Sequence, residues 1–135
     1  MKLSTELNEI QTNFYVSNLD FRFLVLGWSK YLVRPCIKPF SQLKYNSKFA
    51  IINDNENKYI MRVCDVKLFN NVGEAVNPTN YTNILPNSQT MSLDLVRMKV
   101  IAHLQSPKAK KYKVKHGSDP KIMVIEVEPF IDPKE

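Results

Sequence analysis

The chain has 135 residues, 44% of them hydrophobic and 24% charged, which is the composition of one ordinary globular domain. No stretch approaches the roughly 20 apolar residues that cross a bilayer. The first residues, MKLSTELNEIQ, lack the apolar core of a signal peptide. These features exclude a membrane-spanning class, and we expect an intracellular protein.

The positive charge is concentrated in one place. The chain carries 19 basic and 13 acidic residues, a formal charge of +6, and the segment SPKAKKYKVKHGSDPK (residues 106–121) holds six lysines and one aspartate. The other 119 residues are nearly balanced, with 13 basic and 12 acidic side chains. The segment therefore needs an explanation of its own.

Residues 4–15 have the pattern of a helix of modest length. Leu7, Ile10 and Phe14 recur at steps of three and four residues, after a Ser-Thr pair suited to cap the helix. We expect this apolar stripe either to close the floor of the domain or to pack against a helix of a partner protein.

The texture changes to β at Phe21. FRFLVLGWSKYLV is rich in aromatic and branched residues, which predicts a long strand, with Gly27 at a bend in its middle. Trp28 follows the bend, and we expect it to be either a core or rim anchor or a contact for bases or a protein partner.

Two further strands form a predicted hairpin. FAIIN and KYIMRVCDVKLF are separated by the polar insert Asp54–Glu56, which favours a turn. Arg62 interrupts the apolar face of the second strand, which indicates a register shift or an edge position. Residues 70–89 are rich in Asn, Pro and Thr and predict ordered loop, with one helical turn at residues 72–76.

The last predicted pair consists of LDLVRMKVIAHLQ and IMVIEVEPF. In the first, Val96, Met98 and Val100 alternate with charged residues, which is typical of a strand with one buried face. In the second, the side chains alternate between two faces, with Ile122, Val124, Glu126 and Glu128 on one and Met123, Ile125 and Val127 on the other. The lysine segment is then the tip of the hairpin between the two predicted strands.

The order of strand, loop, hairpin, long connection and hairpin predicts a mainly β fold, a five-stranded OB-fold barrel with an N-terminal helix. We expect a single domain over residues 1–135, with the helix at about residues 4–15 and the barrel at about residues 21–130. A β-sandwich, as in a viral accessory protein, has the same strand order and stays open.

In an OB-fold the loops after strand one and between strands four and five border the binding face. Both loops here combine cations with aromatic rings, which attract phosphates and stack unpaired bases. The predicted nucleic-acid-binding residues are Arg34, Lys38, Phe40, Lys44, Tyr45, Lys48, Lys108, Lys110, Lys111, Tyr112, Lys113 and Lys115. We therefore expect single-stranded nucleic acid as a ligand.

These residues also fit roles that involve no nucleic acid. A lysine-rich hairpin tip is often only solubilising or protects a strand pair from aggregation. Phe40 and Tyr45 fit equally well as plugs of the barrel mouth. PKAKKYKVK is also a pattern that a nuclear import receptor reads.

No residue pattern indicates catalysis. His103 and His116 lie near no nucleophile motif, and Cys36 and Cys64 lack the paired spacing of a zinc site. Three glycines in all leave no glycine-rich phosphate loop. We predict a protein that is not an enzyme and uses no metal or cofactor.

In its size, strand order and two basic loops, the chain resembles the small single-OB subunits of eukaryotic single-strand-binding complexes. These are the smallest subunit of replication protein A and the small subunit of the telomeric CST complex. The resemblance implies assembly with a larger OB-fold protein, a role in replication or telomere maintenance, and a nuclear location. The partner-binding residues it suggests are Leu7, Ile10, Phe14 and Trp28. The tail EPFIDPKE departs from these subunits, since its two prolines prevent a C-terminal helix.

Overall fold

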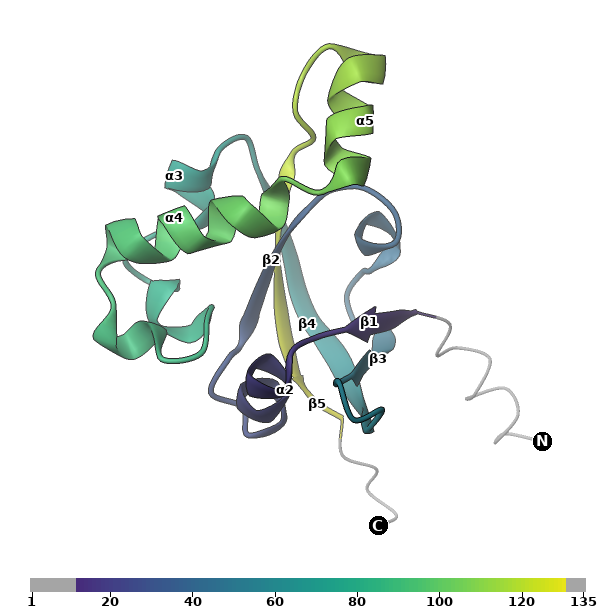
Figure 1. Ribbon diagram of the computed structural model, residues 1–135, viewed down its shortest axis with the longest axis vertical. Coiled ribbons are helices and arrows are strands. Elements are labelled where there is room, and N and C mark those ends of the chain that lie inside the picture. The colour runs from purple at the N-terminus through teal and green to yellow at the C-terminus, as the bar shows by residue number, and fades with distance from the viewer. Residues whose placement is uncertain (1–11, 131–135) are drawn as a thin grey trace, which may run out of the picture.

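The computed structural model describes residues 12–130, which form a strongly curled five-stranded sheet with helices around it (Figure 1). The strands are β1 (Asn13–Tyr15), β2 (Tyr31–Pro35), β3 (Lys48–Ile52), β4 (Lys58–Phe69) and β5 (Ile122–Pro129). Their order in the sheet is β1-β3-β4-β5-β2, and β1 and β3 are parallel while the other pairs are antiparallel. The predicted curled, five-stranded sheet is confirmed, and its two free edges are β1 and β2.

Helices occupy the connections. They are α2 (Asn18–Val25), α3 (Val72–Ala75), α4 (Leu93–Leu104) and α5 (Pro107–His116), with short 3-10 helices at Phe40–Gln42, Tyr81–Asn83 and Ser88–Thr90. In Figure 1, α2 lies at the lower end of the sheet, α4 crosses its left side, and α5 projects from its upper end.

Each face of the sheet carries a hydrophobic core. Met123, Ile125 and Val127 of β5 point into the curl and pack in a core with side chains of every strand and of α2. Ile122 and Val124 point the other way, into a second core beneath α3 and α4. The predicted two-sided alternation of the last strand is therefore correct, and it links the two cores.

The predicted hairpin is confirmed as β3 and β4, with the turn held by the Asn53 side chain, which accepts hydrogen bonds from the amides of Asn55 and Asn57. Of the two explanations offered for Arg62, the structure shows a register shift close to it, because the pairing of β4 with β5 slips between Val63 and Asp65. The predicted helical turn at 72–76 is α3.

The predicted N-terminal helix is not supported. Residues 4–11, including Leu7 and Ile10, lie outside the described residues, and the first helix of the described chain comes after β1. Residues 13–15 form β1, where Phe14 is 9% exposed and stacks on Phe40 with ring centroids 4.9 Å apart. Phe14 therefore belongs to the core of the domain rather than to a helical stripe.

The predicted long strand at Phe21–Val33 is wrong over most of its length, because residues 18–25 form α2 and only residues 31–33 lie in β2. Ser17 caps this helix, and its hydroxyl accepts from the Asp20 amide at 3.1 Å. Gly27, with φ +78°, ends it in a left-handed conformation, and the Trp28 amide returns to the Phe23 carbonyl at 3.0 Å. The glycine is thus a helix stop and not a strand bend.

The predicted strand at LDLVRMKVIAHLQ is also wrong, since these residues form α4. The Ser92 hydroxyl accepts from the Leu95 amide at 3.1 Å and caps the helix. Val96 and Val100, four residues apart, are its buried positions. The spacing of these two valines satisfies a helix as well as a strand.

The lysine segment is not a hairpin tip but the helix α5. Ser106 caps it by accepting from the Ala109 amide at 3.2 Å, Pro107 occupies its first position, and Gly117 with φ +79° ends it. The cationic side chains are therefore displayed on a helix, at spacings that the helix sets.

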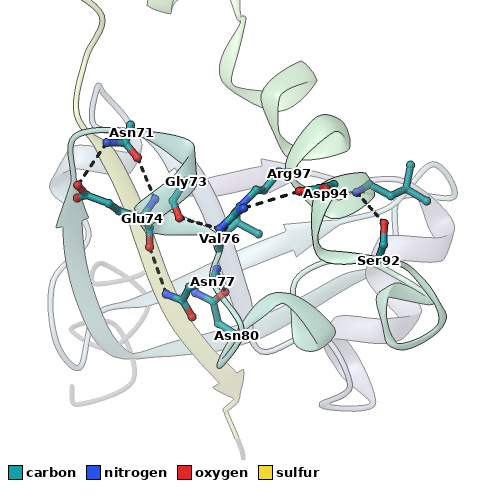
Figure 2. Close-up of polar contacts among 10 residues, drawn as sticks. Asn71, Gly73, Glu74, Val76, Asn77, Asn80, Ser92, Asp94 and Arg97 are labelled. Carbon is teal, nitrogen blue, oxygen red and sulfur yellow. Dashed lines mark hydrogen bonds and ion pairs between the residues drawn. The ribbon is translucent and has the colours of Figure 1, made fainter.

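One arginine of α4 joins this helix to α3 (Figure 2). Arg97 of α4 donates to the carbonyl oxygens of Val76, at 2.8 Å, and Gly73, at 2.9 Å. These carbonyls belong to α3 and its end, which α4 thereby fixes against the sheet. Asp94, 3.8 Å from Arg97 across one turn, holds the guanidinium in place.

Candidate functional site

Helix α5 presents the densest positive charge of the described chain. All five of its lysines are exposed: Lys108, Lys110, Lys111, Lys113 and Lys115. Within residues 12–130, Lys113 is the one among them with an ion pair, to Asp119 at 3.9 Å. Because the helix projects from the upper end of the molecule (Figure 1), its ammonium groups are open to a large anionic partner.

The lysines lie on two sides of α5. Lys108, Lys111 and Lys115, at steps of three and four residues, share one side, and Lys110 and Lys113 share another. Between these sides, Ala109 is buried and the rings of Tyr112 and His116 lie 4.2 Å apart. Tyr112 is thus partly engaged with its own helix.

A groove of about 550 Å³ runs beside the Lys110 and Lys113 side of α5. Side chains of α4, of β5 and of the start of α3 complete its walls, together with Pro35 at the end of β2. We call this hollow the α5 groove.

The start of the other predicted basic segment, residues 34–48, lies beside the α5 groove and the end of the lysine segment. The Cys36 amide donates to the Lys121 carbonyl at 2.7 Å, and Pro35 lines the α5 groove. Farther along, Asn46 accepts from Arg62 of β4 at 3.1 Å, and Lys48 lies 4.5 Å from the Phe130 ring. The α5 groove thus takes Pro35 from this segment, and the predicted basic residues Arg34, Lys38, Lys44 and Lys48 do not line that groove.

The aromatic residues of that segment differ from one another. Phe40 is half-buried and stacked on Phe14, which agrees with a plug of the sheet interior. Tyr45 is 71% exposed. Trp28, the aromatic residue predicted before this segment, is 55% exposed and packs edge-on against Phe23, as the hydrophobic contact that accompanies a glycine helix stop.

Arg34 lies apart from the lysines, between the two free edges of the sheet. Two small hollows of about 20 and 190 Å³ meet there and share Val16, Leu32 and Arg34. We call them the edge cleft. The Arg34 guanidinium donates to the Val33 carbonyl at 2.9 Å and lies 6.0 Å from the Phe40 ring centroid. Burial lowers the pKa of this arginine, an effect that Asp20 opposes.

Three more polar groups line the smaller hollow of the edge cleft: Asp20, Ser29 and His103. His103 of α4 has its pKa lowered by burial and by the Arg34 charge, against a raising effect of Asp20. The buried Ser29 hydroxyl has no hydrogen-bond partner among residues 12–130. A cation, a carboxylate, an imidazole and a hydroxyl therefore converge on a space for one small group.

Residue patterns alone do not bring Asp20, Ser29 and His103 together. The cleft depends on how the edges of the sheet are placed, which a linear pattern does not show. The one available signal is Ser17-x-x-Asp20, because this spacing marks a helix start and places Asp20 at the end of α2 nearest to β1.

The described residues contain no group of three or more His, Cys, Asp and Glu side chains placed to hold a metal ion. Nor does any helix within residues 12–130 have the length and apolar character to cross a membrane.

Comparisons with known proteins identify the fold alone. No protein-family model and no curated protein matches the chain. The crystal structure of hypothetical protein PH0355 is similar, with a TM-score of 0.64 and 15% identity over 87% of this chain and 97% of that one. The solution structure of protein PF0455 from Pyrococcus furiosus has a TM-score of 0.59 and 17% identity, covering 90% and 98%. The chain shares their curled, barrel-like fold, and at this identity the likeness extends to nothing further.

Proposed function

We propose that this protein is a non-catalytic subunit of a single-stranded nucleic-acid-binding assembly, and that α5 is its main contact with the nucleic acid. The observation that carries the proposal is the array of exposed lysines on one projecting helix, of which Lys113 alone has an acidic partner within residues 12–130.

The physical basis is the release of condensed counterions. An ammonium group that replaces a counterion on a phosphate frees that ion into solution, which favours binding at low salt. Lysines on two sides of one helix allow a flexible strand to contact both sides. Exposed Tyr45 is suited to stack a base of a strand that extends beyond α5.

The kind of assembly belongs to the same proposal. A curled five-stranded sheet is the framework on which OB-fold subunits present basic elements, and the predicted likeness to single-strand-binding subunits rests on that framework. It implies a larger OB-fold protein as partner, a role in replication or telomere maintenance, and a nuclear location. The sheet order with β1 parallel to β3 sets this chain apart from the strand assignment predicted for an OB barrel.

The proposal is tested by fluorescence polarisation with labelled single- and double-stranded oligonucleotides at two salt concentrations. We expect tighter binding of the single strand, with log K falling by about 0.7 per phosphate contact for each decade of salt. Replacing Lys110, Lys111 and Lys113 by glutamate should abolish binding, because each substitution reverses a charge on the same helix.

A matched control reverses three exposed lysines outside α5: Lys30, Lys58 and Lys67. It makes the same change in net charge, and we expect it to leave most of the binding. Equal loss in both triple variants would mean that net charge alone acts, and unchanged binding in the α5 variant would refute the role of the helix.

A second candidate is a structural subunit that docks a protein partner without touching nucleic acid. Leu95, Met98 and Ile101 of α4, three residues apart, form an exposed apolar row, and Met98 is 68% exposed. Such a row on a helix that is already packed on its other side fits a protein contact better than solvent.

The substitution Met98→Glu separates the two candidates. If α4 docks a partner, the isolated chain should be poorly soluble and Met98→Glu should raise its solubility, while oligonucleotide binding is unaffected or absent. A wild-type chain that is monomeric and soluble at high concentration by light scattering contradicts this second candidate.

A further inference from the structure

The α5 groove has the size and composition of a ligand site. Its volume of about 550 Å³ falls within the range of small-molecule pockets. Four apolar side chains from α3, α4 and β5 form its floor: Val72, Ile101, Leu104 and Ile122. The groove thus offers an apolar surface on which a planar group can lie.

Cations border this floor on one side. Lys110 and Lys113, one turn apart on α5, both line the groove. Asp119 lines it as well and lies 3.9 Å from Lys113, so that its carboxylate offsets one of the two charges. Lys110 is the cation of the groove without an ion pair within residues 12–130, and the groove keeps a net positive charge.

Side-chain amides border the groove too. Asn70, before α3, and Gln105, at the end of α4, line it, and neither side chain makes a hydrogen bond within residues 12–130. Asn71 is different, because it caps α3 by accepting from the Glu74 amide at 2.9 Å. Asn70 and Gln105 therefore offer both donors and acceptors to a ligand.

We propose that the α5 groove binds one nucleotide unit of a single strand, with the phosphate at Lys110, the base on the floor formed by Ile101, Leu104 and Ile122, and the base edge facing the amides of Asn70 and Gln105. The inference rests on the proposed function and adds the place and the chemical class of one subsite. An unpaired base supplies the flat apolar face and the polar edge that these walls complement.

The groove also accounts for the division of the lysines. Those on the other side of α5, Lys108, Lys111 and Lys115, contact phosphates only through charge, whereas Lys110 acts beside a surface that the base occupies. An acidic peptide would satisfy the lysines and leave the apolar floor and the amides without a role, so we favour the nucleotide.

The test uses the full chain and two matched pairs of variants. Lys110→Ala is paired with Lys115→Ala, which removes the same charge from the same helix outside the groove. Asp119→Asn is paired with Asp54→Asn, which removes an acid from the β3–β4 turn at the opposite end of the molecule (Figure 1). Binding is measured with adenosine and uridine monophosphates by NMR titration, and with a labelled single strand by fluorescence polarisation.

We expect Lys110→Ala to weaken mononucleotide binding about tenfold, the usual loss for one bond to a charged group. Lys115→Ala should keep the mononucleotide affinity within about twofold of the wild type, since its charge lies outside the groove and is screened, and it should weaken only the binding of the longer strand. Asp119→Asn should tighten binding, since it frees Lys113 and removes a like charge beside the phosphate, and Asp54→Asn should not.

The outcomes distinguish a failure of the groove proposal from a failure of the proposed function. If the wild-type chain binds the oligonucleotide but Lys110→Ala and Lys115→Ala lose mononucleotide affinity equally, the groove is not a site, while the proposed function stands. If a polyglutamate peptide displaces the mononucleotides as well as an oligonucleotide does, base recognition in the groove is refuted. If the wild-type chain binds no oligonucleotide, the proposed function fails and this inference with it.

Discussion

The edge cleft and α5 place positive charge in opposite environments. Arg34 is enclosed between β1 and β2, with a carbonyl at 2.9 Å and a ring at 6.0 Å. The lysines of α5 are solvated, and Lys113 has the one ion pair among them within the described chain. Enclosure strengthens each interaction but admits only one small group, whereas exposure weakens each interaction and admits a polymer.

This difference separates two roles that the residue patterns combine. Residues 34–48 and residues 106–121 are both basic and carry aromatic rings, and the sequence predicts that these two segments border one cleft. Instead, they contribute to two separate hollows, and α4 lines both, with His103 in the edge cleft and Ile101 and Leu104 in the α5 groove. Salt should therefore weaken the binding of an anionic polymer to α5 and have little effect on interactions inside the edge cleft.

The largest expected effect concerns the wall of the edge cleft. Phe14→Ala should lower the free energy of unfolding by about 3–5 kcal/mol, because it removes a buried ring that packs on Phe40 and Phe49. Urea unfolding measures it. The neighbouring exposed Tyr15 is the control, and Tyr15→Ala should change stability by no more than about 0.5 kcal/mol. An equal loss of stability in the two variants would contradict the placement of β1 in the core.

The next effect concerns α4, which lines both hollows. Arg97→Ala should cost about 1–3 kcal/mol, because it removes the donors to the Val76 and Gly73 carbonyls. Amide hydrogen exchange in α3 should accelerate. Lys99→Ala, an exposed change on the same helix, should leave that exchange unaltered, and unaltered exchange in Arg97→Ala would show that the arginine does not hold α3.

At α5 the expected effect is smaller and local. Ser106→Ala should lower helix stability by about 1 kcal/mol, since the hydroxyl that accepts from the Ala109 amide is lost. Carbon chemical shifts over residues 107–116 should move toward coil values, and oligonucleotide binding should weaken with them. Ser118→Ala, beyond the helix end, is the control. A fully helical α5 in Ser106→Ala would contradict the capping role.

Arg34 sharpens the comparison because its burial is costly. Arg34→Met fills a similar volume without charge, and we expect a change in stability within about 1 kcal/mol, in either direction. A change this small would show that the fold does not depend on the Arg34 charge. A loss above about 2 kcal/mol on urea unfolding would show instead that the sheet edges depend on the guanidinium.

The smallest effect is on pH dependence. Burial and the Arg34 charge hold the pKa of His103 below its unfolded value of about 6.5. The unfolded chain therefore binds the proton first, and stability falls as the pH drops below about 6.5. His103→Gln should flatten the stability profile in this range, and an equally steep profile in the variant would assign the dependence to other groups.

The parts of the fold that the sequence predicts correctly are those in which apolar residues follow a plain strand pattern. The hairpin of β3 and β4 follows from two apolar runs around a polar insert, and the two faces of β5 follow from strict alternation.

Three of the elements that the sequence patterns misassign are serine-capped helices. Ser17, Ser92 and Ser106 precede α2, α4 and α5, and Gly27 and Gly117 end two of them. Branched and aromatic residues in α2 and α4 favour strands, and lysines in α5 favour a loop. The capping signals are present in the sequence, and tertiary packing decides in their favour.

The same reason explains which part of the candidate site is predictable. The lysines are identified correctly as the concentrated charge, because composition alone reveals them. The edge cleft and the α5 groove are not predictable in this way, since each is made by elements far apart in the chain, as with Asn70 and Lys110 in the α5 groove.

Hydrogen exchange with and without a single-stranded oligonucleotide tests most directly whether exposed α5, rather than the edge cleft, meets nucleic acid. We predict slower exchange over residues 106–121, with unchanged exchange in β1, α2 and β2. Slower exchange confined to residues 13–34, or none anywhere at saturating oligonucleotide, would contradict it.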